Sequence, residues 1–288
     1  MTEDLNPDSL QAFDLLVGKS EQTTTFMRTA GSHDVLVEQK NPRSDAGIFG
    51  EDADKAPEPG PWLEKKVAEI DRMTIAKLAL TTPDKRIVWE FPTPNLTIYS
   101  GNEDVNFSPD GKRLAVSEED NYDVHIVDYE KRELTWTYGT PEKGGSGPGQ
   151  FNYPDDAHLL EDGTFLTADI RNCRVVIIDP ATQKIVTQWG KTGRTHCYHK
   201  PPQYLGSPNG ATPMDNGDIL ITEIRGAWIT RITRGGKVVW DMPAPRIRYP
   251  SDAFPTVDGK QVIVADFMKP GRVVIFDPAT KKVTWEYF

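Results

Sequence analysis

The sequence has little cysteine, few basic residues beside its acidic ones, and no long apolar segment. Two of its 288 residues are cysteine, which neither requires nor excludes an oxidising compartment. Lys and Arg number 33 against 43 Asp and Glu, and the net charge of −10 argues against nucleic acid as a main partner. No apolar run reaches the ~18 residues of a membrane-spanning helix, so we expect no membrane insertion.

The chain also lacks the usual signals of export and of catalysis. Its first residues, MTEDLNPDSLQAFDLL, have neither the basic start nor the apolar core of a signal peptide. As written, the protein is expected in the cytoplasm, or outside the cell if a leader has been removed. The sequence contains no G-x-S-x-G elbow, P-loop, H-E-x-x-H motif or Rossmann fingerprint, so no common catalytic motif assigns a function.

Glycine and proline are abundant, with 23 of each, and they punctuate a repeat. The segment ADIRNCRVVIIDPATQKIVTQWG at 168–190 returns in a looser form, ADFMKPGRVVIFDPATKKVTWEYF, at 265–288. Matched positions in the last strand of each copy, 47, 51, 53 and 45 residues apart, are Trp89, Trp136, Thr187, Trp240 and Trp285. Five copies at a period near fifty, each made of four strand-length pieces, predict an all-β fold, a β-propeller of four-stranded antiparallel blades.

Each of the four clear units contains an Asp-Gly or Asn-Gly turn between its first two strands. These turns fall at 110–111, 162–163, 216–217 and 258–259. One blade cannot bury both of its faces alone, so we expect the aromatic side chains of the last strands to pack between neighbouring blades.

The repeat predicts a single propeller domain over residues 1–288, with four clear units and one distorted unit. The clear units are 100–139, 151–190, 205–242 and 248–288. In the distorted unit, 33–39 and 76–91 are predicted strands, and the polar, Pro-rich stretch 40–62 is interpreted as a surface insertion. Residues 1–30 are poorly assigned, because 9–30 could supply part of a sixth blade or close the ring. Five blades and a six-bladed relative therefore remain alternatives.

Individual repeats resemble known propeller families. The segment YPDDAHLLEDGTFLTADIRNCRVVIIDPATQKIVTQWG at 153–190 resembles an NHL-type repeat. The segments starting at Asn216 and Ser251 resemble repeats of arylsulfotransferase-related and PQQ-binding-like propellers. In DPATKKVTW at 277–285, the Asp, Thr, second Lys and Trp match the tryptophan-docking pattern, with Lys281 where Gly is usual. The resemblance covers roughly 100–288 and implies the fold. It does not imply one activity, because such propellers include hydrolases, lyases, transferases and binding proteins.

The resemblance transfers only part of the families' chemistry. Arylsulfotransferases use a histidine that takes up the sulfuryl group, and none of the five histidines here matches that position. NHL-type amidating lyases hold zinc with inner-strand histidines, and only His158 has such a place. PQQ itself is not implied by a structural repeat motif.

The strand order predicts which residues share one face of the propeller. The loops that lead into each blade, and those between its second and third strands, should lie together. The first loops place acids and amides at the start of the inner strands, at Asp104, Asp155, Asp156, Asn209 and Asp252. His158 follows Asp156 by two residues. Such a ring could bind a small polar molecule or calcium, which takes six to eight oxygen ligands, or it could cap strand ends.

The second strands each end in an acid, at Glu118, Asp169, Glu223 and Asp266. Because these acids recur in every clear blade, we favour a structural role for them. Two copies add an arginine, Arg171 and Arg225, and these arginines could bind a carboxylate, sulfate or phosphate.

The segment GKTGRTHCYHKPPQYLGSPNGATP at 190–213 is the least repetitive part of the clear units. It clusters His196, Cys197 and His199, and Cys173 should approach the same rim. Three interpretations remain open: a Cys173–Cys197 disulfide, a zinc or copper site formed by the four side chains, or unpaired side chains on a packed loop.

Two main functional hypotheses follow. The first is a binding propeller that recognises a small polar or anionic ligand, or a protein partner, at the face carrying this ring. The alternative is an arylsulfotransferase-like or lactonase- or lyase-like enzyme in which His158 acts as acid or base, with possible help from calcium. A third hypothesis is a structural module whose apparent missing blade a partner fills.

Overall fold

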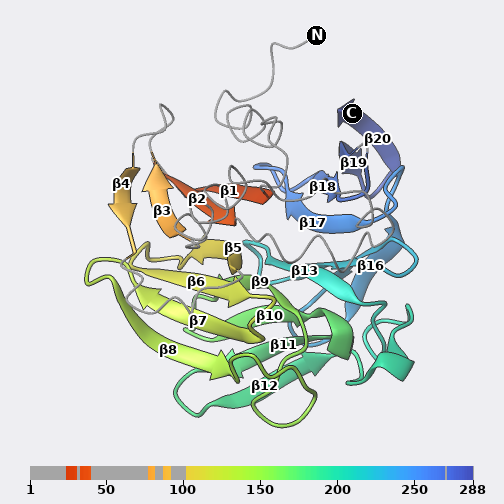
Figure 1. Cartoon of the computed structure of the whole chain (residues 1–288). Helices are drawn as coiled ribbons and strands as arrows, with labels where there is room; N and C mark the ends of the chain where they lie inside the picture. The colour runs from red at the N-terminus through yellow and green to blue at the C-terminus, as the bar shows by residue number, and fades with distance from the viewer. Residues whose placement is uncertain are drawn as a thin grey trace, which may run out of the picture. The chain divides into compact units, whose positions relative to one another are not determined.

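In the computed structural model, the strands of the described residues form four-stranded antiparallel sheets in which sequence neighbours pair (Figure 1). The structure describes residues 24–30, 33–39, 77–81, 87–91, 102–269 and 271–287. The chain forms two compact units, residues 1–103 and 104–288, which are described separately. In the described ranges, no helix is long and apolar enough to cross a membrane.

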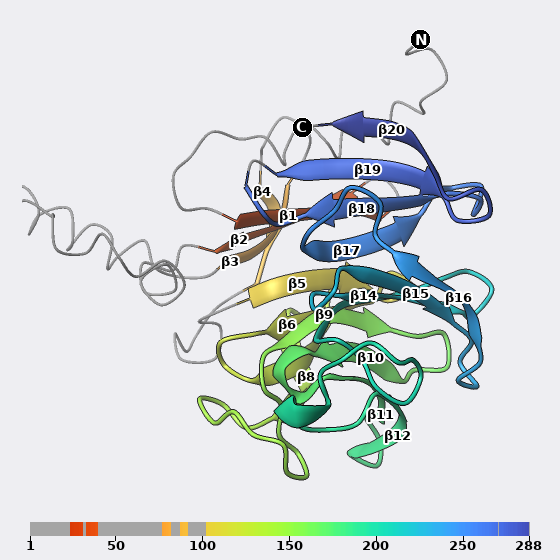
Figure 2. The ribbon, with the colours of Figure 1, turned by 90° about the vertical axis from the view of Figure 1, so that its right-hand side faces the viewer.

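The second unit contains four consecutive sheets, here named blades I to IV. Blade I comprises β5 (Asn102–Phe107), β6 (Arg113–Glu118), β7 (Asp123–Asp128) and β8 (Glu133–Gly139). Blade II comprises β9 (Pro154–Leu159), β10 (Phe165–Asp169), β11 (Arg174–Asp179) and β12 (Lys184–Trp189). Blade III comprises β13 (Pro208–Pro213), β14 (Ile219–Glu223), β15 (Trp228–Ile232) and β16 (Val238–Pro243). Blade IV comprises β17 (Pro250–Pro255), β18 (Val262–Asp266), β19 (Arg272–Asp277) and β20 (Lys282–Tyr287), and Figure 2 shows its strands in this order.

These bounds confirm the predicted units and the propeller architecture. The glycines of the four predicted turns adopt φ values of +68°, +81°, +82° and +67°, a region that glycine enters at little cost. Outside the strands, the described chain adds two short 3-10 turns. η2 (Ile170–Asn172) connects β10 and β11 within blade II, and η3 (Arg194–His196) lies between blades II and III.

The core of this unit lies between successive blades. Trp136 of β8 packs against Phe165 of blade II, with ring centroids 5.2 Å apart, and Tyr138 packs against Phe151 at 5.4 Å. Trp189 of β12 joins a buried cluster with Ile219 of blade III. The prediction that outer-strand aromatics pack between blades is therefore confirmed.

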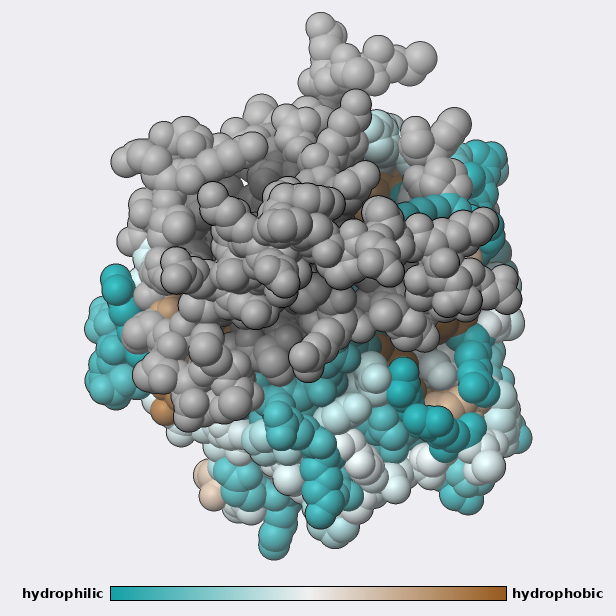
Figure 3. All heavy atoms as spheres, viewed as in Figure 1, coloured by the Kyte–Doolittle hydropathy of each residue, from teal (hydrophilic) through white to brown (hydrophobic). Residues whose placement is uncertain are grey.

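The outer strands present a largely polar surface. Each exposes one large hydrophobic side chain, namely Leu134 on β8, Val186 on β12, Val239 on β16 and Tyr287 on β20. The described surface in Figure 3 is accordingly mostly hydrophilic or neutral, with small hydrophobic areas between.

The first unit contains one sheet, formed by β1 (Thr24–Ala30), β2 (His33–Gln39), β3 (Lys77–Thr81) and β4 (Ile87–Glu90). The strands predicted at 33–39 and 76–91 are confirmed. Residues 24–30, which could supply part of a sixth blade or close the ring, pair along their whole length with β2. Only Gly31 and Ser32 separate the two runs, which is a hairpin signal. The choice between five blades and a six-bladed relative remains a prediction. The predicted insertion 40–62 lies outside the described residues, and the single-domain prediction remains a prediction.

The packing between blades I and II gives a stability prediction. Phe165 is fully buried against Trp136, so Phe165→Ala should lower the free energy of unfolding by about 3–5 kcal/mol through lost burial and a cavity. Urea unfolding measures this loss. The matched control is Val186→Ala in the same blade, where the side chain is 54% exposed and the change should stay within about 0.5 kcal/mol. Equal effects of the two substitutions would contradict the proposed core.

Candidate functional site

The inner strands bring most of the predicted ring residues together at the start of each blade. Strand β13 lies against both β9 and β17. Each of these three strands carries a bulge, and the irregular stretches contain Asp156, Asn209 and Asp252. Because a bulge redirects side chains locally, the orientation of these residues depends on it. Asp156 itself has a φ of +54°, which is unusual for a residue with a Cβ.

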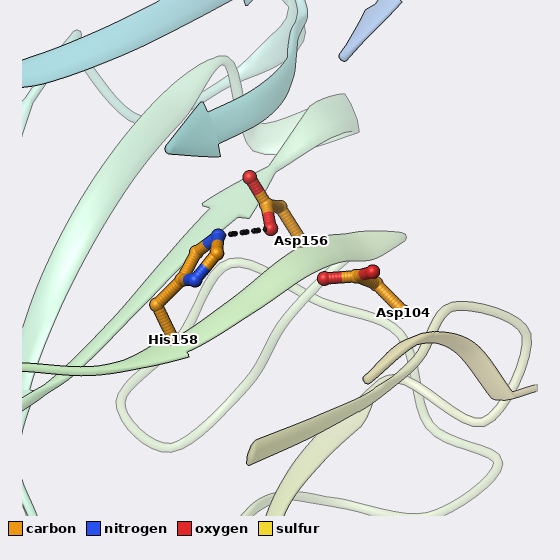
Figure 4. A group of neighbouring side chains, drawn as sticks. All are labelled: Asp104, Asp156 and His158. Carbon is orange, nitrogen blue, oxygen red and sulfur yellow. Dashed lines mark ion pairs between the residues drawn. The ribbon is translucent and has the colours of Figure 1, made fainter. Parts of the chain in front are cut away.

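The centre of the site is formed by Asp104 of β5 with Asp156 and His158 of β9 (Figure 4). His158 Nε2 lies 2.6 Å from Asp156 Oδ1, and both side chains are 3% exposed. One polar atom from each of the three side chains lies within 4.8 Å of the others. The structure thus joins residues from two blades that are more than fifty positions apart in the sequence.

Asp104 and Asp156 also link successive inner strands. Asp104 Oδ2 accepts a hydrogen bond of 3.1 Å from the amide of Ala157, and Asp156 Oδ2 accepts one of 2.7 Å from the amide of Ala211. A hydrogen bond from a backbone amide to a buried carboxylate favours the ionised form and fixes its position. These two acids therefore have a structural role in addition to any ligand they bind.

Two residues that form hydrogen bonds in this site were not predicted from the sequence. Asn106 donates to Asp104 Oδ2 at 2.5 Å and to the carbonyl of Ala157 at 3.0 Å. Thr222 accepts from the amide of Gly210 at 2.7 Å and donates to the carbonyl of Ser251 at 2.5 Å. For Thr222, the sequence signal was a polar residue after the apolar run ILI, which is weak because Thr is common in strands. Asn106 lies in the largely polar strand NEDVNF, where it did not stand out.

The remaining inner-strand acids surround this centre. The Asn209 amide donates to Asp155 Oδ2, which joins blades II and III. A Cβ on Gly210 would lie 2.6 Å from Asp252 Oδ1, so glycine stands where blade II has Asp156. Asp104, Asp155 and Asp252 are half-buried, whereas Asp156, His158 and Asn209 are buried. We name these six residues the inner-strand group.

Electrostatics keep the centre of the group charged. Burial acts to raise the pKa of Asp156, but the charge and hydrogen bond of His158, a hydrogen bond with Asp104 and the Ala211 amide outweigh it and lower the pKa. Asp156 is therefore an ionised acceptor at neutral pH.

The two predicted arginines are held by neighbouring loops. The Arg171 guanidinium lies 3.4 Å from the ring centroid of Tyr153, and Arg225 Nη1 donates to the carbonyl of Cys197 at 3.3 Å. Both arginines therefore make these contacts outside the centre formed by Asp104, Asp156 and His158.

The loop before blade III contains a disulfide. Cys173 and Cys197 are bonded, with their Cα atoms 5.2 Å apart. His199 points elsewhere: it donates to or accepts from Glu223 at 2.9 Å and Asp241 at 3.0 Å, and stacks on Trp228 at 3.8 Å. The structure therefore does not bring Cys173, His196, Cys197 and His199 together as one set of metal ligands.

The second-strand acids cap loops, as the repeat suggested. Asp169 bonds Arg174 at 2.8 Å and the amide of Asn152 at 2.8 Å. Asp266 accepts hydrogen bonds from the amides of Arg248, Tyr249 and Met268 at 3.0–3.1 Å.

Burial raises the pKa of Asp169 to about 6 in spite of Arg174. Burial likewise raises the pKa of Glu118 to about 7, against hydrogen bonds from His125 and Asn121.

The chemistry of the donors bears on which metal the inner-strand group could hold. Asp104, Asp156 and His158 are close enough to share one ion. One of the three donors is an imidazole nitrogen, whereas calcium prefers an all-oxygen shell of six to eight ligands. A calcium ion is thus less favoured than an ion with mixed ligands, and the calcium prediction remains a prediction.

His199 gives a prediction about pH. Burial acts to lower the pKa of His199, but hydrogen bonds and charge interactions with Glu223 and Asp241 outweigh burial and raise the pKa above 6.5. Its stabilising contribution is then complete below the unfolded-state pKa of about 6.5 and is lost as the pH rises through the folded-state pKa. The stability lost in His199→Gln should therefore be greater near about pH 5.5 than near about pH 9.

Chemical denaturation at a series of pH values measures this difference. His196→Gln serves as the control, because His196 lies in the same loop and its ring contacts Tyr204. A pH-independent loss in His199→Gln would contradict the proposed ion pairs.

Together, these features define the second unit as a β-propeller with a buried Asp–His pair at the start of its inner strands. No protein-family model and no curated protein matches the chain. Among solved structures, it is similar to a catalytically inactive histidine-to-alanine variant of virginiamycin B lyase from Staphylococcus aureus with quinupristin. The TM-score is 0.56 at 15% identity, covering 94% of this chain and 71% of that chain.

Two further structures are similar to the chain. A streptogramin B lyase matches with a TM-score of 0.53 and 14% identity, covering 94% of this chain and 80% of that chain. Hydrazine synthase of Kuenenia stuttgartiensis matches with a TM-score of 0.48 and 16% identity over 65% of this chain. The chain covers 48% of that protein's length. At these identities the two lyase comparisons show the fold alone, a β-propeller.

Proposed function

We propose that this propeller binds a small polar ligand through the inner-strand group, and that the ligand is cationic or rich in hydrogen-bond donors. The observation that carries the proposal is the convergence of carboxylates on one histidine: Asp104 and Asp156 approach His158 from two blades. An ionised carboxylate only accepts hydrogen bonds, so such a group selects ligands that donate hydrogen bonds.

The exposure of the group supports this assignment. Asp104, Asp155 and Asp252 are half-buried, while the residues that orient them are buried. A ligand in contact with these three acids would meet two that are already held, Asp104 by Asn106 and Asp155 by Asn209. Such preorganisation lowers the entropy lost on binding.

The charge balance favours a ligand that donates hydrogen bonds over an anionic ligand. The two predicted arginines lie outside the centre of the group, where they contact Tyr153 and the Cys197 carbonyl. The chain carries a net charge of −10, which opposes the approach of an anionic ligand.

A second candidate function is a propeller enzyme of the lyase or lactonase type. The ion pair between His158 Nε2 and Asp156 favours it, because a carboxylate paired with an imidazole orients the ring for proton transfer. The similarity to virginiamycin B lyase, a protein inactivated by loss of a histidine, supports testing this reaction class.

The binding proposal predicts a selective shift in thermal stability. Spermidine, glucosamine and inositol at millimolar concentration should include at least one ligand that raises Tm by about 2 °C or more, whereas citrate and sulfate should not. Asp155→Asn should reduce the shift. Asp162→Asn should retain it, because Asp162 lies in the turn at the opposite end of β9. A shift with the anions alone, or an equal shift in Asp155→Asn, would overturn the proposal.

The enzyme candidate predicts turnover that depends on His158. Quinupristin and a panel of simple lactones are incubated with the protein and followed by liquid chromatography and mass spectrometry. Wild type should form product, and His158→Gln should slow the reaction by about 10²–10⁴-fold, because it removes the proton-transfer group. Absence of product with wild type, or equal rates in both proteins, would exclude this reaction class for these substrates.

A further inference from the structure

Blade I contains a second buried group of titratable side chains, separate from the inner-strand group. Glu118 ends β6, while Asp123 and His125 lie on β7. The two acids are 0% exposed and the histidine is 1% exposed. Full burial of two carboxylates is costly unless positive charge or hydrogen bonds compensate for it.

The three side chains converge on a single point. His125 Nε2 lies 3.3 Å from Glu118 Oε2 and 3.4 Å from Asp123 Oδ1. Tetrahedral coordination with metal–ligand bonds of about 2.0–2.2 Å places neighbouring ligand atoms roughly 3.3–3.5 Å apart. The two separations measured from His125 Nε2 fall in this range.

An independent observation shows that hydrogen bonds do not complete this group. Glu118 Oε1 is buried and has no hydrogen-bond partner. In the described chain, the side chains that hydrogen-bond to the Glu118 carboxylate are Asn121 and His125, and both meet the other oxygen, Oε2. A buried carboxylate oxygen without a partner is rare and points to a bound ion or water.

The corresponding positions of the other blades explain why blade I differs. In the β6–β7 pairing Asp123 stands opposite Glu118, and in blade II Arg174 stands opposite Asp169 and neutralises it. Blade III pairs Glu223 with His199, and its second carboxylate, Asp241, is 41% exposed. Blade I thus combines two fully buried carboxylates with one imidazole, and lacks the arginine of blade II at this position.

We propose that Glu118, Asp123 and His125 form a structural site for a divalent transition-metal ion of the zinc type. The ion would supply the positive charge that Arg174 supplies in blade II, and would bind the Glu118 carboxylate whose Oε1 has no other partner. Mixed imidazole and carboxylate ligands suit zinc.

The surroundings of the group match those of a metal site. His125 Nδ1 lies 2.9 Å from Thr137 Oγ1, so the second ring nitrogen is held by a hydrogen bond, as is usual for a metal-ligating histidine. The Asn121 amide donates to Glu118 Oε2 at 2.9 Å and to Asp123 Oδ1 at 3.2 Å, which orients both carboxylates. The site would fasten the β6–β7 loop to the centre of blade I.

The test measures metal content and thermal stability of the wild-type protein. Protein purified without chelator should contain about one zinc per chain, or bind one zinc when titrated. Chelation should lower Tm by about 3 °C or more, and added zinc should restore it. Calcium should not restore it. A protein that neither contains nor binds zinc, with a Tm unaffected by chelator and by zinc, would overturn the proposal.

Matched variants locate the ion. Asp123→Asn and Glu118→Gln keep the size of the side chain and should abolish both zinc binding and the response to chelator. His158→Gln, which alters the inner-strand group, should retain both. Cobalt in place of zinc should give the visible absorption of a tetrahedral ion in wild type and in His158→Gln. Loss of metal in His158→Gln with retention in Asp123→Asn would place the ion in the inner-strand group and overturn the proposal.

Discussion

The hydrogen bonds between successive inner strands are the interaction on which the arrangement of the site depends. A carboxylate of one strand accepts from the backbone amide of the next, from Asp104 to Ala157 and from Asp156 to Ala211. Among the described residues, no strand of one sheet pairs with a strand of another sheet. Side-chain acceptors therefore make these polar links, and they place His158 beside acids from two blades.

The acids at the ends of the second strands show one structural problem solved in several ways. Each buried carboxylate must be compensated, because an isolated buried charge is unfavourable. Blade II uses Arg174, blade III uses His199, and blade IV uses backbone amides around Asp266. Blade I uses His125 for two carboxylates, and this imbalance is the basis of the proposed metal site.

The loop before blade III shows how a variable segment is held on a repetitive framework. A disulfide from Cys197 reaches Cys173, and two residues later His199 bonds Glu223 and stacks on Trp228. The same short segment is thus attached to blades II and III. Because these attachments use the two cysteines and His199, the residues that looked like metal ligands serve to fix the loop.

The sequence by itself determined the blades and their order, because alternating apolar runs and Asp-Gly turns are local signals that repeat. It also indicated the residues of the inner strands, since a repeat places equivalent positions at equivalent depths. Only the tertiary structure decided which contacts the polar side chains make. A bulge turns Asp156, neighbouring loops hold Arg171 and Arg225, and burial leaves Glu118 Oε1 without a hydrogen-bond partner. These outcomes depend on contacts between residues distant in sequence, and no local pattern encodes which partner a buried charge will meet.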